Sequence, residues 1–423
     1  MTTSRRPLAY VMVAAVAGAL ALSACSSTTT TTPGATTTSG SAGSSTSTKG
    51  TTTGSTPGTT PGSTLAVKVD DAGVVKTYGS LVEKSYAASL ASAKKLQTTI
   101  DTFIATPTEA NLEATKKQWL AARDDYGPTE AFRFYDGPID NPDDGPEGQI
   151  NAWPMDEAYV DYVDGATSKG IIGDAAGYPD ITNDVIVEAN EKDGETNIST
   201  GWHAIEFLLW GQDLNADSAG TRPVTDYTTE PNAKRRGTYL ALLANRLVDD
   251  IAGVSEQWVP NVAGNYRATF EASPSESLGK ILRGIGALTA GELAGQRMGV
   301  AFDTRDQEDE HSCFSDNTAA DVKGNAIGVQ RVYTAKFPGV SGPSLADLVA
   351  AKSPETNTKL MAKLDATVKA TSNFPATFEK MIAAEDGSAN RTALKDAITG
   401  FEEQGELIAE AAKALGVTVN FEV

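Results

Sequence analysis

Apolar residues recur along most of this chain at the spacing of one face of an α-helix, roughly three or four positions apart. The longest run of this kind predicts a helix over residues 72–104. Its apolar positions include Val74, Val75, Tyr78, Val82, Tyr86 and Leu90. The same pattern predicts helices over 233–253 and, more weakly, over 318–335. A last helix should cover about 390–415 and stop before Gly416, because glycine commonly ends a helix.

Further helices are marked by their first residues. Thr-Pro-Thr-Glu at 106–109 predicts a helix that runs to about Tyr126. Threonine caps a helix, proline suits its first position, and the acid completes a capping box. Ser-Pro-Ser-Glu at 273–276 predicts a helix that runs to about Phe302, and Ser-Pro-Glu at 353–355 predicts another.

Strand-like alternation is confined to one short segment, residues 181–187, which we expect to be extended. We therefore predict an all-α protein of two fused antiparallel helical bundles with short connections. The folded part should cover 65–420, in halves of about 65–230 and 231–420, because each half has a polar motif that follows a proline-capped helix. Residues 136–198 are rich in Gly, Pro, Asp and Asn and predict a long loop region.

The N-terminus is predicted to be an export signal and not part of the fold. Residues 1–24 contain a basic start, an apolar core and small residues before Cys25. The ending Leu-Ser-Ala-Cys resembles a bacterial lipoprotein signal, in which Cys25 would carry lipid; an ordinary secretory signal is the alternative. Residues 25–64 are almost wholly Ser, Thr, Gly and Pro after the cysteine, so we expect a disordered tether. The protein should then be anchored on the extracytoplasmic side of a bacterial membrane.

The net charge limits the classes of binding partner, and the two cysteines limit the disulfides that the chain can form. The formal net charge is −20, which argues against nucleic acid as a partner and is compatible with cation capture. If Cys25 carries lipid, Cys313 has no partner within the chain, so no intramolecular disulfide supports the fold. A free cysteine is more often a buried, inert thiol than a functional group.

One of the two histidines, His203, stands three residues before Glu206 in an apolar run with helical character. On a helix this spacing places both side chains on one face. Such a pair can share a divalent metal, act as a base with its orienting group, or be an ordinary hydrogen-bonded pair in the core. A metal site needs further ligands, and the candidates are Glu130, Asp156 and Asp213.

The other histidine, His311, lies in a strongly acidic run that includes Asp303, Asp306, Glu310 and Asp316. So many carboxylates cannot all be buried without partners. They should be solvated, pair with neighbouring arginines, or bind a metal, and composition alone favours a solvated loop.

Other familiar chemistries find little support. The sequence has no His-Glu-x-x-His zinc motif, no Gly-x-Ser-x-Gly elbow and no phosphate-binding loop of the Walker type. The acidic segment from Asp140 fails the EF-hand pattern, because Pro142 and Asn151 occupy positions where ligands are needed.

At its polar motifs the chain resembles the imelysin family. Gly-x-His-x-x-Glu at 201–206, followed by Phe-Leu-Leu-Trp-Gly-Gln-Asp, is similar to the family signature, and so is the run 303–318. Shorter pieces that resemble the family lie at 129–134, 137–140 and 150–157. The resemblance covers roughly 70–415 and is strongest to the iron-regulated, lipoprotein branch.

The resemblance implies a pseudo-duplicated all-α fold in which the Gly-x-His-x-x-Glu motif lines a cleft between two bundles. Members of the family are exported and linked to iron or haem uptake at the cell envelope, and the family is also classed among metallopeptidases. For this chain it implies a metal ion or iron complex at His203 and Glu206. It also implies contact with the membrane through the lipid only, and envelope iron-transport proteins as partners.

Two functions are therefore carried forward. The first is binding of a metal ion or iron complex in the envelope. The second is a metal-dependent peptidase in which His203 ligates the metal and Glu206 ligates it or acts as base. One histidine among oxygen ligands suits iron, manganese or calcium better than catalytic zinc, so binding is favoured. Iron, calcium, zinc and haem all remain candidates for what is bound.

Overall fold

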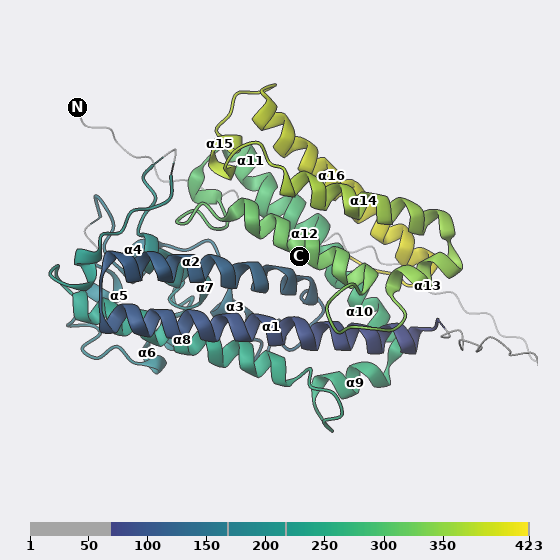
Figure 1. Cartoon of the computed structure of the whole chain (residues 1–423), viewed down its shortest axis with the longest axis horizontal. Helices are drawn as coiled ribbons and strands as arrows, with labels where there is room; N and C mark the ends of the chain where they lie inside the picture. The colour runs from purple at the N-terminus through teal and green to yellow at the C-terminus, as the bar shows by residue number, and fades with distance from the viewer. Residues whose placement is uncertain (1–68, 167–168, 216–217, 422–423) are drawn as a thin grey trace, which may run out of the picture. The chain divides into compact units, whose positions relative to one another are not determined.

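A computed structural model of the chain describes residues 69–166, 169–215 and 218–421. The predicted signal peptide, Cys25 and the tether lie outside these described residues. Every regular element within the described ranges is a helix, so the predicted all-α class is confirmed (Figure 1). Among the same residues, no helix combines the length and the apolar character needed to cross a membrane.

The first group of helices is built around α1 (Asp71–Ala105) and α2 (Glu109–Tyr126), which a short link makes antiparallel. The helix α8 (Ala233–Glu256) packs along α1, and the short α7 (Gly201–Trp210) lies against α2 and α8. Figure 1 shows α1, α2 and α8 side by side. Although α8 begins beyond the boundary predicted at residue 230, it packs with this first group, so the division there stays a prediction.

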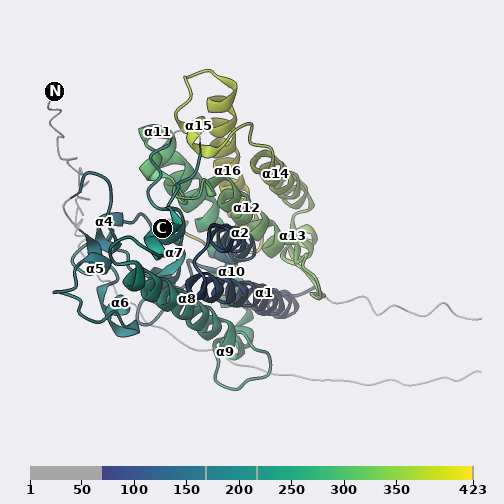
Figure 2. The ribbon, with the colours of Figure 1, turned by 60° about the vertical axis from the view of Figure 1, so that its left-hand side comes forward.

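The second group of helices packs around α16 (Ala389–Ala414). Its other long members are α10 (Pro274–Gly286), its π-helical continuation η3 (Ala287–Val300), α12 (Thr318–Thr334) and α14 (Pro354–Ser372). In both views α14 and α16 lie on the side of the molecule away from α8 (Figures 1 and 2). The shorter members are α11 (Ala301–Thr304), α13 (Leu345–Lys352) and α15 (Phe378–Ile382).

Short helices occupy the region predicted to be a long loop and several other connections between the long helices. They are η1 (Gly127–Phe132), α3 (Glu147–Ile150), α4 (Glu157–Val160), α5 (Gly170–Gly173), α6 (Asn183–Ala189), η2 (Val224–Tyr227), α9 (Tyr266–Ala272) and η4 (Gln307–Asp309). The prediction of an extended segment at 181–187 was wrong. Thr182 caps α6 there, since its hydroxyl accepts a hydrogen bond from the backbone N–H of Val185. A local cap of this kind outweighs a short alternating pattern.

The predicted helix starts are largely confirmed. Pro274 and Pro354 both stand in the first turn of their helices, where a missing backbone N–H costs nothing. In α2 the cap is Thr108 and not Thr106, because the Thr108 hydroxyl accepts from the N–H of Asn111. Pro107 therefore precedes the cap and does not open the helix.

One predicted helix changes character along its length. The segment from 273 to 302 was expected to be a single α-helix, but residues Ala287–Val300 form a π-helix. This stretch is rich in Ala and Gly, and neither residue's size opposes the wider turn. The π-helix carries Arg297 into the interior, where it meets residues of the first group.

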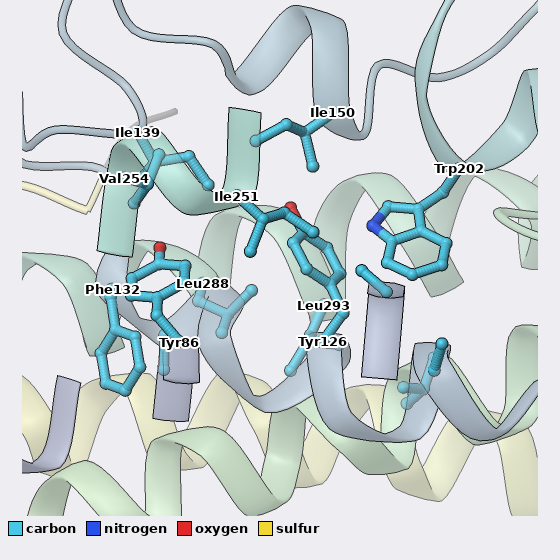
Figure 3. Packing of buried hydrophobic residues seen from close by; sticks show 14 of the residues in the cluster. Tyr86, Tyr126, Phe132, Ile139, Ile150, Trp202, Ile251, Val254, Leu288 and Leu293 are labelled. Carbon is cyan, nitrogen blue, oxygen red and sulfur yellow. The ribbon is translucent and has the colours of Figure 1, made fainter. Parts of the chain in front are cut away.

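The interior of the first group is filled by large aromatic and branched side chains. Figure 3 shows Tyr86 of α1, Tyr126 of α2 and Trp202 of α7 packed close to Ile251 of α8, and all four are fully buried or nearly so. Burial of each such apolar side chain stabilises the fold by about 1.5–3 kcal/mol. This core holds α7 in the middle of the molecule, so the motif on α7 is an interior feature.

Candidate functional site

The helix α7 carries the Gly-x-His-x-x-Glu motif, and every residue in it is buried. It begins at Gly201, whose φ is +86°. A Cβ at Gly201 would lie 2.6 Å from the carbonyl oxygen of Ile150, closer than atoms pack. Only glycine accepts both conditions, so α7 can begin directly against the end of α3. This contact sets the position of His203 two residues later.

His203 and Glu206 form a buried hydrogen-bonded pair. The Nδ1 of His203 lies 2.9 Å from the Oε2 of Glu206. The Oε1 of Glu206 accepts hydrogen bonds from the backbone N–H of Ser315 at 3.0 Å and from the Ser315 hydroxyl at 2.6 Å. Burial raises the pKa of Glu206 to about 8, and burial together with the charge of Arg123 lowers the pKa of His203 to about 3. At neutral pH the pair is therefore a hydrogen bond between uncharged groups and not an ion pair.

The second histidine lies against the first. The ring centroids of His203 and His311 are 4.7 Å apart, and their planes cross at 74°. The Nδ1 of His311 is 3.0 Å from the Oδ2 of Asp321 on α12. Each imidazole is thus held through Nδ1 by a carboxyl group, and its Nε2 is the nitrogen left for another partner. The Nε2 of His203 is buried and has no hydrogen-bond partner.

Asp321 accepts most of the hydrogen bonds around the two histidines. Besides His311, it accepts hydrogen bonds from the hydroxyl of Ser312, from Asn317 at 3.2 Å and from the Nε of Arg123 at 3.2 Å. Burial alone would raise the pKa of Asp321, but the guanidinium of Arg123 and the bond from His311 hold it well below its usual range. Because Arg123 comes from α2 and Asp321 from α12, this ion pair joins the two groups of helices.

A second buried ion pair joins η1, the short helix that follows α2, to the second group. Glu130 of η1 is fully buried and pairs with Arg297 of η3. The other charge partner of Glu130 is Arg133, with an N–O distance of 3.8 Å. Burial would raise the pKa of Glu130, but the charge of Arg297 lowers it, so the carboxylate stays ionised. The amide of Asn151 links the two ion pairs, since it contacts Glu130 at 3.4 Å and Arg123 at 2.5 Å.

Comparisons with known proteins identify the family of the chain. The profile of the family described as Imelysin matches residues 82–404. The chain belongs to the imelysin family. Its Gly-x-His-x-x-Glu motif lies inside the matched region, and so does the acidic run that brings His311 against His203.

The chain is also similar to two proteins with iron-regulated names. Iron-regulated protein A of Synechococcus elongatus is 28% identical over 276 residues, which cover 63% of this chain and 65% of that relative. The match thus spans just under two thirds of the relative's length. The crystal structure of a Parabacteroides distasonis protein, provisionally named an iron-regulated protein A precursor, superposes with a TM-score of 0.62 at 16% identity, covering 83% of this chain and 98% of that one. This likeness shows a shared fold.

The residues named from the sequence as candidate metal ligands do not assemble into one ligand set. Both oxygens of Glu206 are engaged by hydrogen bonds, and the charge of Glu130 is taken up by Arg297. Asp156 is exposed and caps α4 by accepting from the N–H of Ala158 at 3.0 Å. Within the ranges that the structure describes, no three His, Cys, Asp or Glu side chains are placed to hold a metal ion. Asp213 lies elsewhere, with its carboxylate bonded to Gln307 and to the N–H of Asn215.

The acidic run around His311 divides into exposed and buried parts. Asp303 and Asp306 are exposed, and Asp306 caps η4. Glu310 and His311 are buried, and Asp316 is half-buried. The run is therefore not the fully solvated loop that composition favours. Cys313 is buried as expected.

Sequence reasoning missed the charged residues that position the two histidines. Arg123 and Asp321 are 198 positions apart, and each looks like an ordinary polar residue of a surface helix. The one signal was the fit of Arg123 to the helix pattern of α2, since it falls on the buried face with Trp119 and Tyr126. A charged residue on an apolar face predicts a buried partner, but not which one.

Proposed function

We propose that this imelysin binds an iron species through the imidazoles of His203 and His311, outside the cytoplasm. The observation that carries the proposal is that the Nε2 of His203 is buried without a hydrogen-bond partner. The ring of His203 also lies beside that of His311, with 4.7 Å between the ring centroids. In metal sites a ligating histidine commonly donates its other ring N–H to a carboxylate. Asp321 stands in that relation to His311 as a carboxylate, and the carboxyl group of Glu206 occupies the corresponding place beside the Nδ1 of His203. In this proposal they orient the ligands and are not ligands themselves.

Two imidazoles leave most positions around a metal ion open, which suits an iron complex that brings oxygen ligands of its own. The iron-regulated name of the Synechococcus relative supports iron over zinc or calcium. Haem fits less well, because the two rings cross at 4.7 Å and leave no space for a porphyrin between them.

The geometry gives the peptidase alternative less support. A general base must be ionised and must reach the attacking water. Glu206 is completely buried, burial raises its pKa to about 8, and its oxygens are bonded to His203 and Ser315. If the wild-type protein loaded with zinc cleaves a broad peptide library and Glu206→Gln does not, the peptidase function replaces the one proposed.

Replacing His203 by alanine should abolish iron binding. The mature protein would be stripped of metal and incubated with ferric citrate, and bound iron would be measured by elemental analysis after gel filtration. Glu206→Gln should weaken binding by about 10–100-fold, as expected for a group that orients a ligand. Asp156→Asn is the matched control and should bind as wild type, because Asp156 is exposed and caps α4. Iron retained in full by folded His203→Ala would refute the site.

We also propose that the chain is anchored by lipid at Cys25. The support is the signal-like sequence before it and the low-complexity segment after it. Cys25→Ser should move the protein from the membrane fraction to the soluble fraction of lysed cells, measured by immunoblotting. A variant that stays with the membranes would contradict the anchor.

A further inference from the structure

The segment of residues 305–317 carries Ser315 and His311, so it supplies one of the two paired imidazoles. It is bound to the site itself through the bonds from Ser315 to Glu206 and from His311 to Asp321. The segment is also held at Arg305, which donates to the carbonyl oxygen of Ala384 at 2.7 Å, and at Glu310, whose carbonyl oxygen accepts from the ring N–H of Trp153 at 2.8 Å. A further contact is made by Asp316, whose φ is +57°.

Asp316 meets other carboxyl groups. Its side chain lies within hydrogen-bonding reach of Glu379 on α15 and of Asp213, which follows α7. Asp316 Oδ1 and Glu379 Oε2 are both buried and lack a hydrogen bond from any nitrogen or hydroxyl donor. The charged groups that act on Asp316 most strongly are these two acids, and Glu310 of the same segment adds to the cluster.

Two ionised carboxylates repel each other, so a hydrogen bond between Asp316 and Glu379 requires a proton between them. Shared protons of this kind are known from other pairs of adjacent acids. Burial, followed by the hydrogen bond to Glu379, raises the pKa of Asp316 to about 8. Burial likewise raises the pKa of Glu310 well above its usual range.

We propose that a proton shared by Asp316 and Glu379 latches the 305–317 segment to α15, and that loss of this proton to solvent loosens the segment. Loss leaves two carboxylates beside Asp213 with no donor between them. The latch itself is independent of any ligand. Its consequence for access to the imidazoles rests on the proposed function.

The direction of the pH dependence follows from the raised pKa. A carboxyl group whose pKa is higher in the folded protein stabilises it at low pH, and this contribution is lost as the pH rises through the folded value. The latch should therefore be closed below neutrality and loosened as the pH passes about 8.

Hydrogen–deuterium exchange of the iron-free full chain tests the latch. After correction for the intrinsic rate, exchange in 305–317 should rise about tenfold between about pH 6 and about pH 9, since one unit above the pKa leaves about a tenth of the group protonated. Asp316→Asn should remove this dependence, because an amide N–H donates to Glu379 at either pH. Glu379→Gln should also remove the pH dependence, and it replaces Asp316→Asn as the test variant if Asp316→Asn does not fold. Peptides from α14 are the internal control.

Equal corrected exchange at the two pH values in wild type would overturn the latch, and so would full pH dependence in both amide variants. The exchange measurements are made without iron, so their outcome does not depend on whether the proposed function is correct. A second arm measures the rate of binding of ferric citrate. It should rise with pH in wild type but not in Asp316→Asn. If iron does not bind at all while the exchange result holds, the proposed function fails and the latch remains.

Discussion

Asp321→Ala should lower the free energy of unfolding by about 3–5 kcal/mol, the range found when one partner of a buried ion pair is removed. The side chains of Arg123 and Asp321 are 0% and 1% exposed, so water cannot replace the lost partner. The substitution leaves Arg123 without its principal anion and His311 without its hydrogen-bond acceptor. Urea unfolding followed by circular dichroism measures the change.

The matched control is Asp365→Ala. Asp365 lies on α14, is exposed, and accepts a single hydrogen bond from Gln330 at 2.7 Å. Its loss should change stability by no more than about 0.5 kcal/mol. The double variant Arg123→Met, Asp321→Leu should recover much of the loss, because no charge is left buried alone. If Asp321→Ala costs no more than the control, the ion pair does not join the two groups of helices as described.

Gly201→Ala should destabilise the fold by about 2–4 kcal/mol, since a positive φ is strained for any residue with a Cβ and a backbone collision is added to it. The new Cβ would lie 2.6 Å from the carbonyl oxygen and 2.8 Å from the carbonyl carbon of Ile150. These are main-chain atoms at the end of α3, so they cannot move aside by a change of rotamer. Thermal unfolding measures the loss, and any repositioning of α7 would also shift His203.

Gly253→Ala is the control with the opposite expected sign. Gly253 lies within α8, and a Cβ there would meet no atom within 4 Å. Alanine is favoured over glycine inside a helix by about 0.8–1.0 kcal/mol, so this variant should be more stable than wild type. A Gly201→Ala protein as stable as Gly253→Ala would show that α3 and α7 do not meet as the structure has them.

Much of the helical framework could be predicted from local sequence. The apolar stripe of α1 gave a helix whose ends differ little from the structure, and the first residues of α10 and α14 gave the start of each helix. These features depend on neighbours along the chain, which periodicity and capping chemistry report directly. The errors arose where the hydrophobic pattern did not decide the local structure. Residues 181–187 were expected to be extended but include the start of the capped helix α6, and part of a predicted α-helix is the π-helix η3.

The candidate site could be predicted only in part. The motif on α7 identified His203 and Glu206 as neighbours, because their spacing along one helix is local. The ion pair of Glu130 could not be predicted, since the arginine that neutralises it comes from η3, far along the chain. The capping bond of Asp156 could not be predicted either, because a helix of four residues is too short to show a periodic pattern.

By itself the sequence determined the all-α class, the buried helix of the Gly-x-His-x-x-Glu motif and the membership in the imelysin family. Only the tertiary structure decided that His203 lies against His311, that Asp321 meets Arg123, and that Asp316 reaches Glu379. The physical reason is that local sequence sets backbone conformation and the face each side chain occupies. Pairing of buried polar groups depends on which distant faces the packing brings together, and that is fixed by the whole core at once.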